Sequence, residues 1–111
     1  MPSQPALPGG VTVISTGTIA FTLAAGQTRT FEGQDLATAR GATPPPSAAL
    51  VWTVAWRATD PLSAAWYRQT SHTELGRGRW GTAELGGAGF ELRNEGTSNV
   101  VGELTYIIGS R

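Results

Sequence analysis

The chain has a single histidine, His72, and a histidine placed near a hydroxyl and a carboxylate can act as a general base. Ser71 precedes it directly and Glu74 follows two positions later. However, no Gly-x-Ser-x-Gly segment is present that would form a nucleophile elbow, and Ser71 is the immediate neighbour of His72. We therefore interpret His72 as a solvated loop histidine and predict no catalytic residue and no enzymatic activity.

Pairs of carboxylates can hydrolyse a glycosidic bond, and the chain offers Glu84, Glu91, Glu95 and Glu103 for such a pair. Glu91 and Glu103 could face each other across a hairpin near the C-terminus. Both lie out of phase with the apolar positions around them, so the pattern predicts a solvent-facing pair without a catalytic role.

Metal and cofactor binding find little support. Zinc prefers three or four Cys, His or carboxylate ligands at defined spacing, and this chain has one His and no Cys. Its two aspartates, Asp35 and Asp60, are isolated, whereas calcium needs clustered carboxylates. The glycine-rich segment 86–89 lacks the Lys-Ser/Thr ending of a phosphate loop. The sequence therefore predicts no metal site and no cofactor.

Four tryptophans stand out in a chain of 111 residues. Trp52 and Trp56 share the phase of Leu50 and Val54 in an alternating segment, which predicts that both lie in the core.

Two further tryptophans indicate a contact surface. Trp66 and Tyr67 are neighbours, so in a strand they point to opposite faces and at least one lies outside the core. Trp80 sits beside Arg77 and Arg79 in a glycine-rich stretch that we expect to be a loop. An exposed tryptophan near arginine can stack on a sugar ring or anchor a protein contact, although Trp80 could equally cap one end of the domain. These five residues form the predicted contact surface.

The elements that must position these residues are strands. The segments 18–23 and 50–57 alternate clearly, and turn signals such as Thr16-Gly17, Thr59-Asp60-Pro61 and the flexible stretch 75–79 separate short strands. One helical turn is compatible with residues 35–40. The expected strands cover residues 11–15, 18–23, 28–31, 50–57, 64–71 and 80–85, followed by the two strands of a terminal hairpin.

The last residues, 90–111, predict that hairpin. Phe90 and Leu92 alternate before the turn-rich segment 94–99, and Leu104, Tyr106 and Ile108 alternate after it. About eight short strands at roughly ten-residue spacing favour an all-β fold, an antiparallel two-sheet sandwich that is jelly-roll-like.

The chain length is that of one domain. We expect a flexible N-terminal arm over residues 1–10, which hold three Pro and two Gly, and a single β-sandwich domain over 11–111. The arm either frays or crosses onto a neighbouring subunit. It lacks the features of a signal peptide, and no apolar run approaches the ~20 residues that span a bilayer, so a soluble protein is expected.

The formal charge is zero, with eight Arg, no Lys and eight acidic residues. This balance argues against nucleic acid and against a membrane surface as partners, since both attract basic patches. Charged residues make up 14% of the chain, below the roughly 25% of an average domain. A sparsely charged surface predicts that other subunits cover part of it, as in a homo-oligomer or a larger assembly.

Two segments, FTLAAGQTRTF at 21–31 and LRNEGT…GELTY within 92–106, resemble the small β-sandwich proteins of tailed-bacteriophage virions, such as head decoration, tail or fibre-associated subunits. The resemblance covers about a third of the chain and carries over no functional residue. It implies a non-enzymatic structural protein, located in a virion, that acts through protein–protein contacts. The alternative is a small carbohydrate-binding module that uses its exposed aromatic residues.

Overall fold

The structure is a computed structural model of the 111-residue chain, and it describes residues 10–39, 41, 43, 49–68, 71–86 and 88–111. Its elements, in chain order, are β1 (Thr12–Leu23), β2 (Thr28–Phe31), α1 (Gly33–Ala39), β3 (Leu50–Arg68), β4 (Ser71–Glu84), β5 (Gly89–Arg93) and β6 (Val100–Ser110). Residues 1–9 of the expected arm lie outside the described residues. The expected helical turn corresponds to α1.

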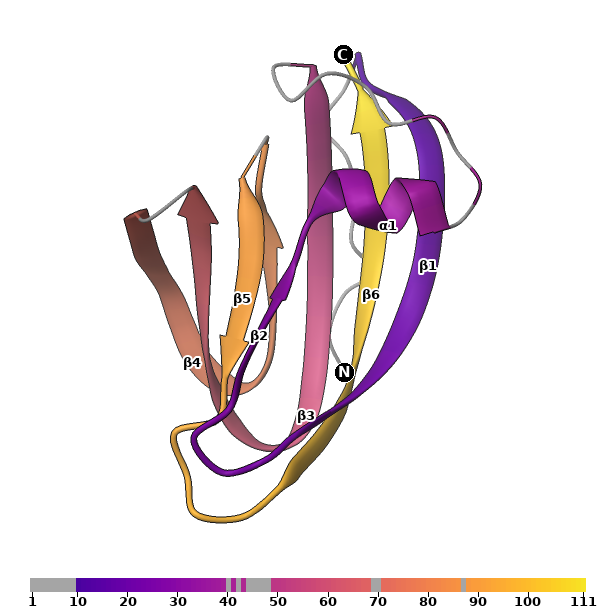
Figure 1. The fold of residues 1–111 in the computed structure, drawn as a ribbon. Helices are drawn as coiled ribbons and strands as arrows, with labels where there is room; N and C mark the ends of the chain where they lie inside the picture. The colour runs from indigo at the N-terminus through magenta and orange to yellow at the C-terminus, as the bar shows by residue number, and fades with distance from the viewer. Residues whose placement is uncertain (1–9, 40, 42, 44–48, 69–70, 87) are drawn as a thin grey trace.

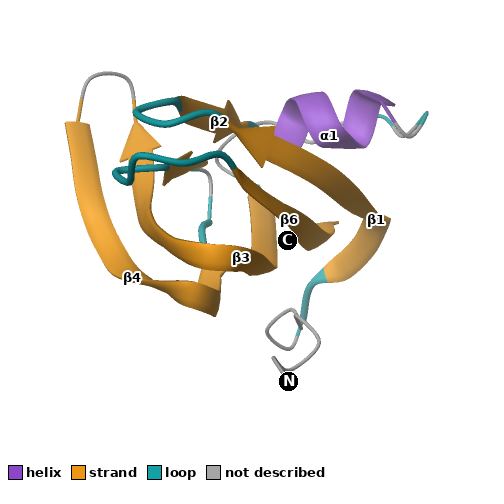
Figure 2. Ribbon diagram, turned by 90° about the horizontal axis from the view of Figure 1, so that it is seen from below, coloured by secondary structure: helices purple, strands orange, loops and turns teal. Residues whose placement is uncertain are grey.

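All strand pairs are antiparallel, and the strands form one six-stranded sheet in the order β1-β6-β3-β5-β2, with β4 paired to β3 outside this path. The first part of β3, up to Ala58, pairs with β6, and the part from Ser63 to Tyr67 pairs with β5. Figures 1 and 2 show that the sheet curls strongly, so that β2 and β5 lie across from β6 and β1 and the sheet forms a half-barrel.

The curl comes from a bend in β3. The register between β3 and β4 shifts between Arg57 and Leu62, and the bend contains Thr59, Asp60 and Pro61, all exposed. Proline cannot donate to a ladder, and within a sheet it is tolerated at bulges and irregular positions. The sequence prediction that β3 ends at Pro61 is therefore wrong: the strand bends there and continues to Arg68.

The core fills the inside of the curl. Trp52 and Trp56 are both buried there, as predicted, and the ring of Trp56 lies 5.4 Å from that of Phe90 on the opposite wall. The indole N–H of Trp52 donates to the carbonyl oxygen of Ala88 at 2.7 Å. The remaining core side chains come from β1, β2, β3, β5, β6 and α1, and include Phe21, Leu23, Phe31, Ala37, Val54, Leu62, Leu92, Leu104, Tyr106 and Ile108.

The predicted terminal hairpin is wrong. β5 and β6 are the expected strands, but they do not pair with each other: β5 pairs with β2 and β3, and β6 pairs with β1 and β3. The link between them is organised by Asn94, which is buried; its side-chain amide donates to the carbonyl oxygens of Leu23 and Ser98, and its oxygen accepts from the N–H of Gly96. The link therefore takes the chain from β5, which pairs with the second half of β3, to β6, which pairs with the first half.

The strands are also fewer and longer than the expected eight. Thr16-Gly17 does not interrupt β1, where the absence of a Gly17 side chain makes room for the ring of Tyr106. The stretch 75–79 is part of β4 rather than a flexible turn. The all-β, antiparallel character is confirmed, but the described strands form a single curled sheet in place of two separate sheets.

The described part of the chain holds one helix, α1, with seven residues, and no helix there is long and apolar enough to cross a membrane.

Candidate functional site

The structure does not bring the five predicted contact residues together on one surface. Trp66 packs, partly buried, against the core. Tyr67 and Arg77 lie on the outer face of the sheet in its β5 half, in a polar cluster described below. Trp80 lies on the outer face in the β6 half, and Arg79 is exposed on β4 between the two. Within the described residues no ion pair holds Arg79.

Trp80 is the most exposed large apolar side chain in the described part of the chain, at 59%. It belongs to β4, which runs through both the stretch 75–79 that the sequence suggested to be a turn and the expected strand 80–85. It stands opposite Arg57 of β3, which in turn stands opposite Glu103 of β6, and Glu103 stands opposite Ala20 of β1. One row of side chains therefore crosses four strands on the outer face.

The centre of this row is an ion pair. Arg57 Nη2 donates to Glu103 Oε2 at 3.1 Å, and both side chains are about half exposed. Glu103 therefore does not face Glu91, a pairing that the predicted hairpin would have allowed. Exposed ion pairs of this kind contribute little to stability.

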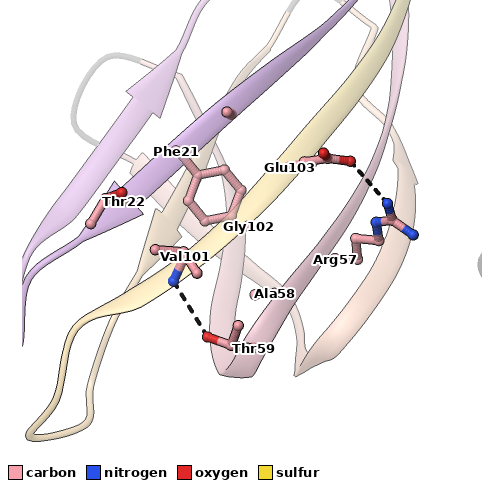
Figure 3. Close-up of a pocket in the computed structure, with 9 residues that line it drawn as sticks. Phe21, Thr22, Arg57, Ala58, Thr59, Val101, Gly102 and Glu103 are labelled. Atoms are coloured by element: carbon pink, nitrogen blue, oxygen red, sulfur yellow. Dashed lines mark hydrogen bonds and ion pairs between the residues drawn. The ribbon is translucent and has the colours of Figure 1, made fainter.

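Next to the ion pair the sheet surface is hollowed. The hollow has a volume of about 610 Å³, and Figure 3 shows Val101 and Thr59 beside the Arg57–Glu103 pair. The Val101 side chain is 48% exposed, and its backbone N–H donates to Thr59 Oγ1 at 3.4 Å. The residues lining the hollow are Ala20, Phe21, Thr22, Arg57, Ala58, Thr59, Val101, Gly102 and Glu103. We call this surface, together with Trp80, the Trp80 face.

The Trp80 face combines an exposed indole, an exposed valine, an ion pair and a recess between small side chains. Exposed apolar groups bordered by polar ones are typical of contact surfaces. Sequence reasoning identified Trp80 but missed Arg57, Val101 and Glu103. Their alternation with the core residues of β3 and β6 placed them outside the core, but nothing local in the sequence indicated that β3, β4 and β6 would align them.

The second cluster, the His72 cluster, contains a buried carboxylate. Glu91 is 5% exposed, and its Oε2 lies 2.9 Å from Nδ1 of His72 on β4. Its Oε1 lies 3.4 Å from Nη2 of Arg93. His72 and Glu91 meet across β3 above Ala65, whose small side chain leaves the space between them. The predictions of a loop histidine and a solvent-facing Glu91 are therefore wrong, because the strand register brings β4 and β5 to opposite sides of β3.

Tyr67 and Arg77 flank this pair. The Tyr67 ring stacks on His72, with centroids 5.8 Å apart, and its hydroxyl donates to Glu32. Burial, followed by the hydrogen bond to Glu32, raises the pKa of Tyr67 to about 12. Arg77 pairs with Glu95 and, through Nε at 2.8 Å, with Glu74. The hydrogen bond with Glu95 is the main cause that raises the pKa of Arg77 above its ordinary value.

The His72 cluster has the carboxylate–histidine pair of a general base, but a general base needs a proton donor within reach. Among the described residues, no hydroxyl hydrogen-bonds to His72, and no group of three or more His, Asp or Glu side chains is arranged to hold a metal. The hollow beside it has a volume of about 230 Å³ and is lined mainly by side chains that already pair with one another. The contacts of the cluster join β3, β4 and β5 to one another and to Glu32, the residue after β2.

No protein-family model matches the chain, and a search of curated proteins finds no match either.

Proposed function

We propose that this protein is a non-enzymatic structural subunit that binds other proteins through the Trp80 face. The observation that supports this proposal is the 59% exposure of Trp80 beside the Arg57–Glu103 pair and the 610 Å³ hollow. Leaving an indole in water is unfavourable, and tryptophan is enriched at the centres of protein interfaces. The low charge of the chain, 14%, also suits a surface that a partner covers.

The assembly proposed for this subunit is a virion of a tailed bacteriophage, in line with the resemblance of segments 21–31 and 92–106 to such proteins. A decoration, tail or fibre-associated subunit needs a stable sheet and a complementary face, and it needs no catalytic group. A soluble, non-membrane location is part of the same proposal.

The test is co-sedimentation of the purified chain with particles built from the structural proteins encoded beside its gene. The wild-type chain is expected to sediment with the particles. Trp80→Ala is expected to weaken binding about thirtyfold, because truncating a central interface tryptophan costs about 2 kcal/mol or more. Thr16→Ala, an exposed change on β1 that does not line the hollow, serves as the matched control. A turnover activity that disappears when one polar residue is replaced would overturn the proposal.

The exposed indole of Trp80 beside the polar Arg57–Glu103 pair also favours a second candidate, a carbohydrate-binding surface. A sugar ring can stack on the indole while its hydroxyls bond the charged groups. Titration with soluble oligosaccharides, followed by tryptophan fluorescence, distinguishes the two. Saturable binding by a monomer that Trp80→Ala abolishes would place this candidate first.

A further inference from the structure

The outer edge of β4 offers a second interaction surface, distinct from the Trp80 face. β4 has fourteen residues, none of them buried, and among the described strands it pairs only with β3. Figures 1 and 2 both show β4 at the outer margin of the sheet. A strand in this position carries a row of backbone N–H and C=O groups without partners in the sheet, and another extended strand satisfies them best.

Two of the devices that commonly protect such an edge, proline and lysine, are absent from β4. The segment Ser71–Glu84 contains no proline and no lysine, and it exposes Leu75. Leu75 is the extra residue of a bulge, because the register passes directly from Gly76 opposite Ala64 to Glu74 opposite Ala65. An exposed leucine on an open edge is a natural point of contact.

The order of the charged residues along β4 indicates which strand can pair with its open edge. In the arm Ser71–Gly78, Glu74 lies on one side of Gly76 and Arg77 on the other, and both stand on the outer face opposite Ala65 and Ser63. An antiparallel second copy, related by a two-fold axis at Gly76, would place each Glu74 opposite Arg77 of the partner subunit on the same face, because the bulge residue Leu75 takes no position of its own in the register. Opposite charges directly across an antiparallel pair are favourable, and a two-fold axis forms both contacts at once.

The other two edge strands, β1 and β2, offer no comparable pattern that would select a partner strand. β1 carries no charged side chain between Thr12 and Leu23, and β2 has only four residues. At the axis itself Gly76 has open space where a side chain would stand, so two strands can approach closely there. The two Leu75 side chains would then lie next to the axis and cover each other.

We infer that the chain forms a two-fold dimer by antiparallel pairing of the β4 arm Ser71–Gly78 with the same arm of a second copy. This inference rests on the proposed contact-making function and names a second copy of the chain as one partner. The dimer continues the sheet across the axis and leaves the Trp80 face of each copy available for a different protein.

The test uses charge reversal and analytical ultracentrifugation of the whole chain. Glu74→Arg and Arg77→Glu, each alone, place like charges opposite each other, and the dimer dissociation constant is expected to rise about tenfold or more. An equimolar mixture of the two variants restores both opposite-charge pairs, so a mixed dimer is expected to form. Thr16→Arg, which adds a charge on β1, is the matched control and should dimerise as the wild type does.

A second measurement guards against misfolded variants. Circular dichroism and thermal unfolding check that each variant folds, and hydrogen exchange of the wild type is expected to show amide protection in 71–78 that rises with protein concentration. A wild type that stays monomeric at its highest attainable concentration overturns the inference, and so does a dimer that neither reversal weakens. Neither result affects the Trp80 face, which the co-sedimentation of Trp80→Ala tests separately.

Discussion

β3 and β4 are consecutive antiparallel strands, yet they occupy opposite environments. β3 has neighbouring strands on both sides in each of its halves, and seven successive residues, Leu50–Trp56, are buried. Among the described strands β4 pairs with β3 alone, and none of the residues of β4 is buried. Each strand carries tryptophan: Trp52 is fully buried, and Trp80 is 59% exposed. β3, which has neighbouring strands on both sides, therefore stabilises the fold. β4, at the margin of the sheet, keeps exposed side chains that are free to bind.

The largest expected effect contrasts the two tryptophans. Trp52→Ala removes a fully buried ring and its hydrogen bond to Ala88, so the free energy of unfolding should fall by about 3–5 kcal/mol. Trp80→Ala removes an exposed ring and should change it by about 0.5 kcal/mol or less. Urea unfolding of both variants measures the contrast. Equal losses would mean that β3 and β4 share the stabilising role.

The next largest effect on stability is expected from a comparison of two glycines, Gly102 and Gly76. A Cβ atom on Gly102 of β6 would lie 2.3 Å from the backbone oxygen of Arg57 and 2.6 Å from the ring of Phe21. Because backbone cannot move aside easily, Gly102→Ala should destabilise the protein by about 1–3 kcal/mol. Gly76→Ala on β4 meets no atom within 4 Å and should be nearly neutral. Thermal unfolding of the two variants tests this, and a neutral Gly102→Ala would show that β3 and β6 can separate at little cost.

The raised pKa of the Tyr67 hydroxyl predicts that the protein loses stability in alkali. Its pKa is raised from 10.0 in the unfolded chain to about 12 in the fold, so its contribution is complete below pH 10 and is lost as the pH rises toward 12. Two pH units correspond to about 2.7 kcal/mol at most, and partial exposure of the ring reduces this to about 1 kcal/mol.

Urea unfolding across that pH range, compared with Tyr67→Phe, measures this contribution. The variant should lose less stability than the wild type as the pH rises. Parallel curves for the two proteins would exclude Tyr67 as a source of the loss.

The smallest expected effect concerns the outer face of β3. Glu103→Gln breaks the exposed pair with Arg57 and should change the free energy of unfolding by about 0.5 kcal/mol or less. A loss above 2 kcal/mol, roughly the cost of disturbing a buried network, would show that this end of β3 stabilises the fold as its core half does. Salt dependence of the unfolding midpoint provides the control, since an exposed pair is screened.

Much of the local structure was predictable. Alternation in 50–57 placed Trp52 and Trp56 in the core, and the structure confirms both. The strands around Phe90 and Tyr106 were also located by their alternation. Trp80 was identified as a candidate for contacts, although its exposure was left open and it was expected in a loop.

The pairing of the strands was not predictable from the same patterns. A strand with alternating side chains can pair with any neighbour, and a turn-rich link such as 94–99 is compatible with a hairpin or with a connection between two parts of a sheet. The side-chain amide of Asn94 stabilises the connection between two parts of the sheet by donating a hydrogen bond to the carbonyl oxygen of Leu23. These two residues are far apart in the chain. The surroundings of Glu91 were predicted wrongly for the same reason. Its partner His72 lies on β4, which comes near β5 because both strands pair with β3.

The sequence by itself determined that the chain is antiparallel β, which side chains of each strand are apolar, and that reactive groups are few, because these depend on residue type and on spacing along one strand. The tertiary structure alone decided which strands are neighbours, that β3 bends and continues past Pro61, and that Trp80, Arg57 and Glu103 form one row. These depend on contacts between distant residues, whose energies come from how the whole sheet curls around its core.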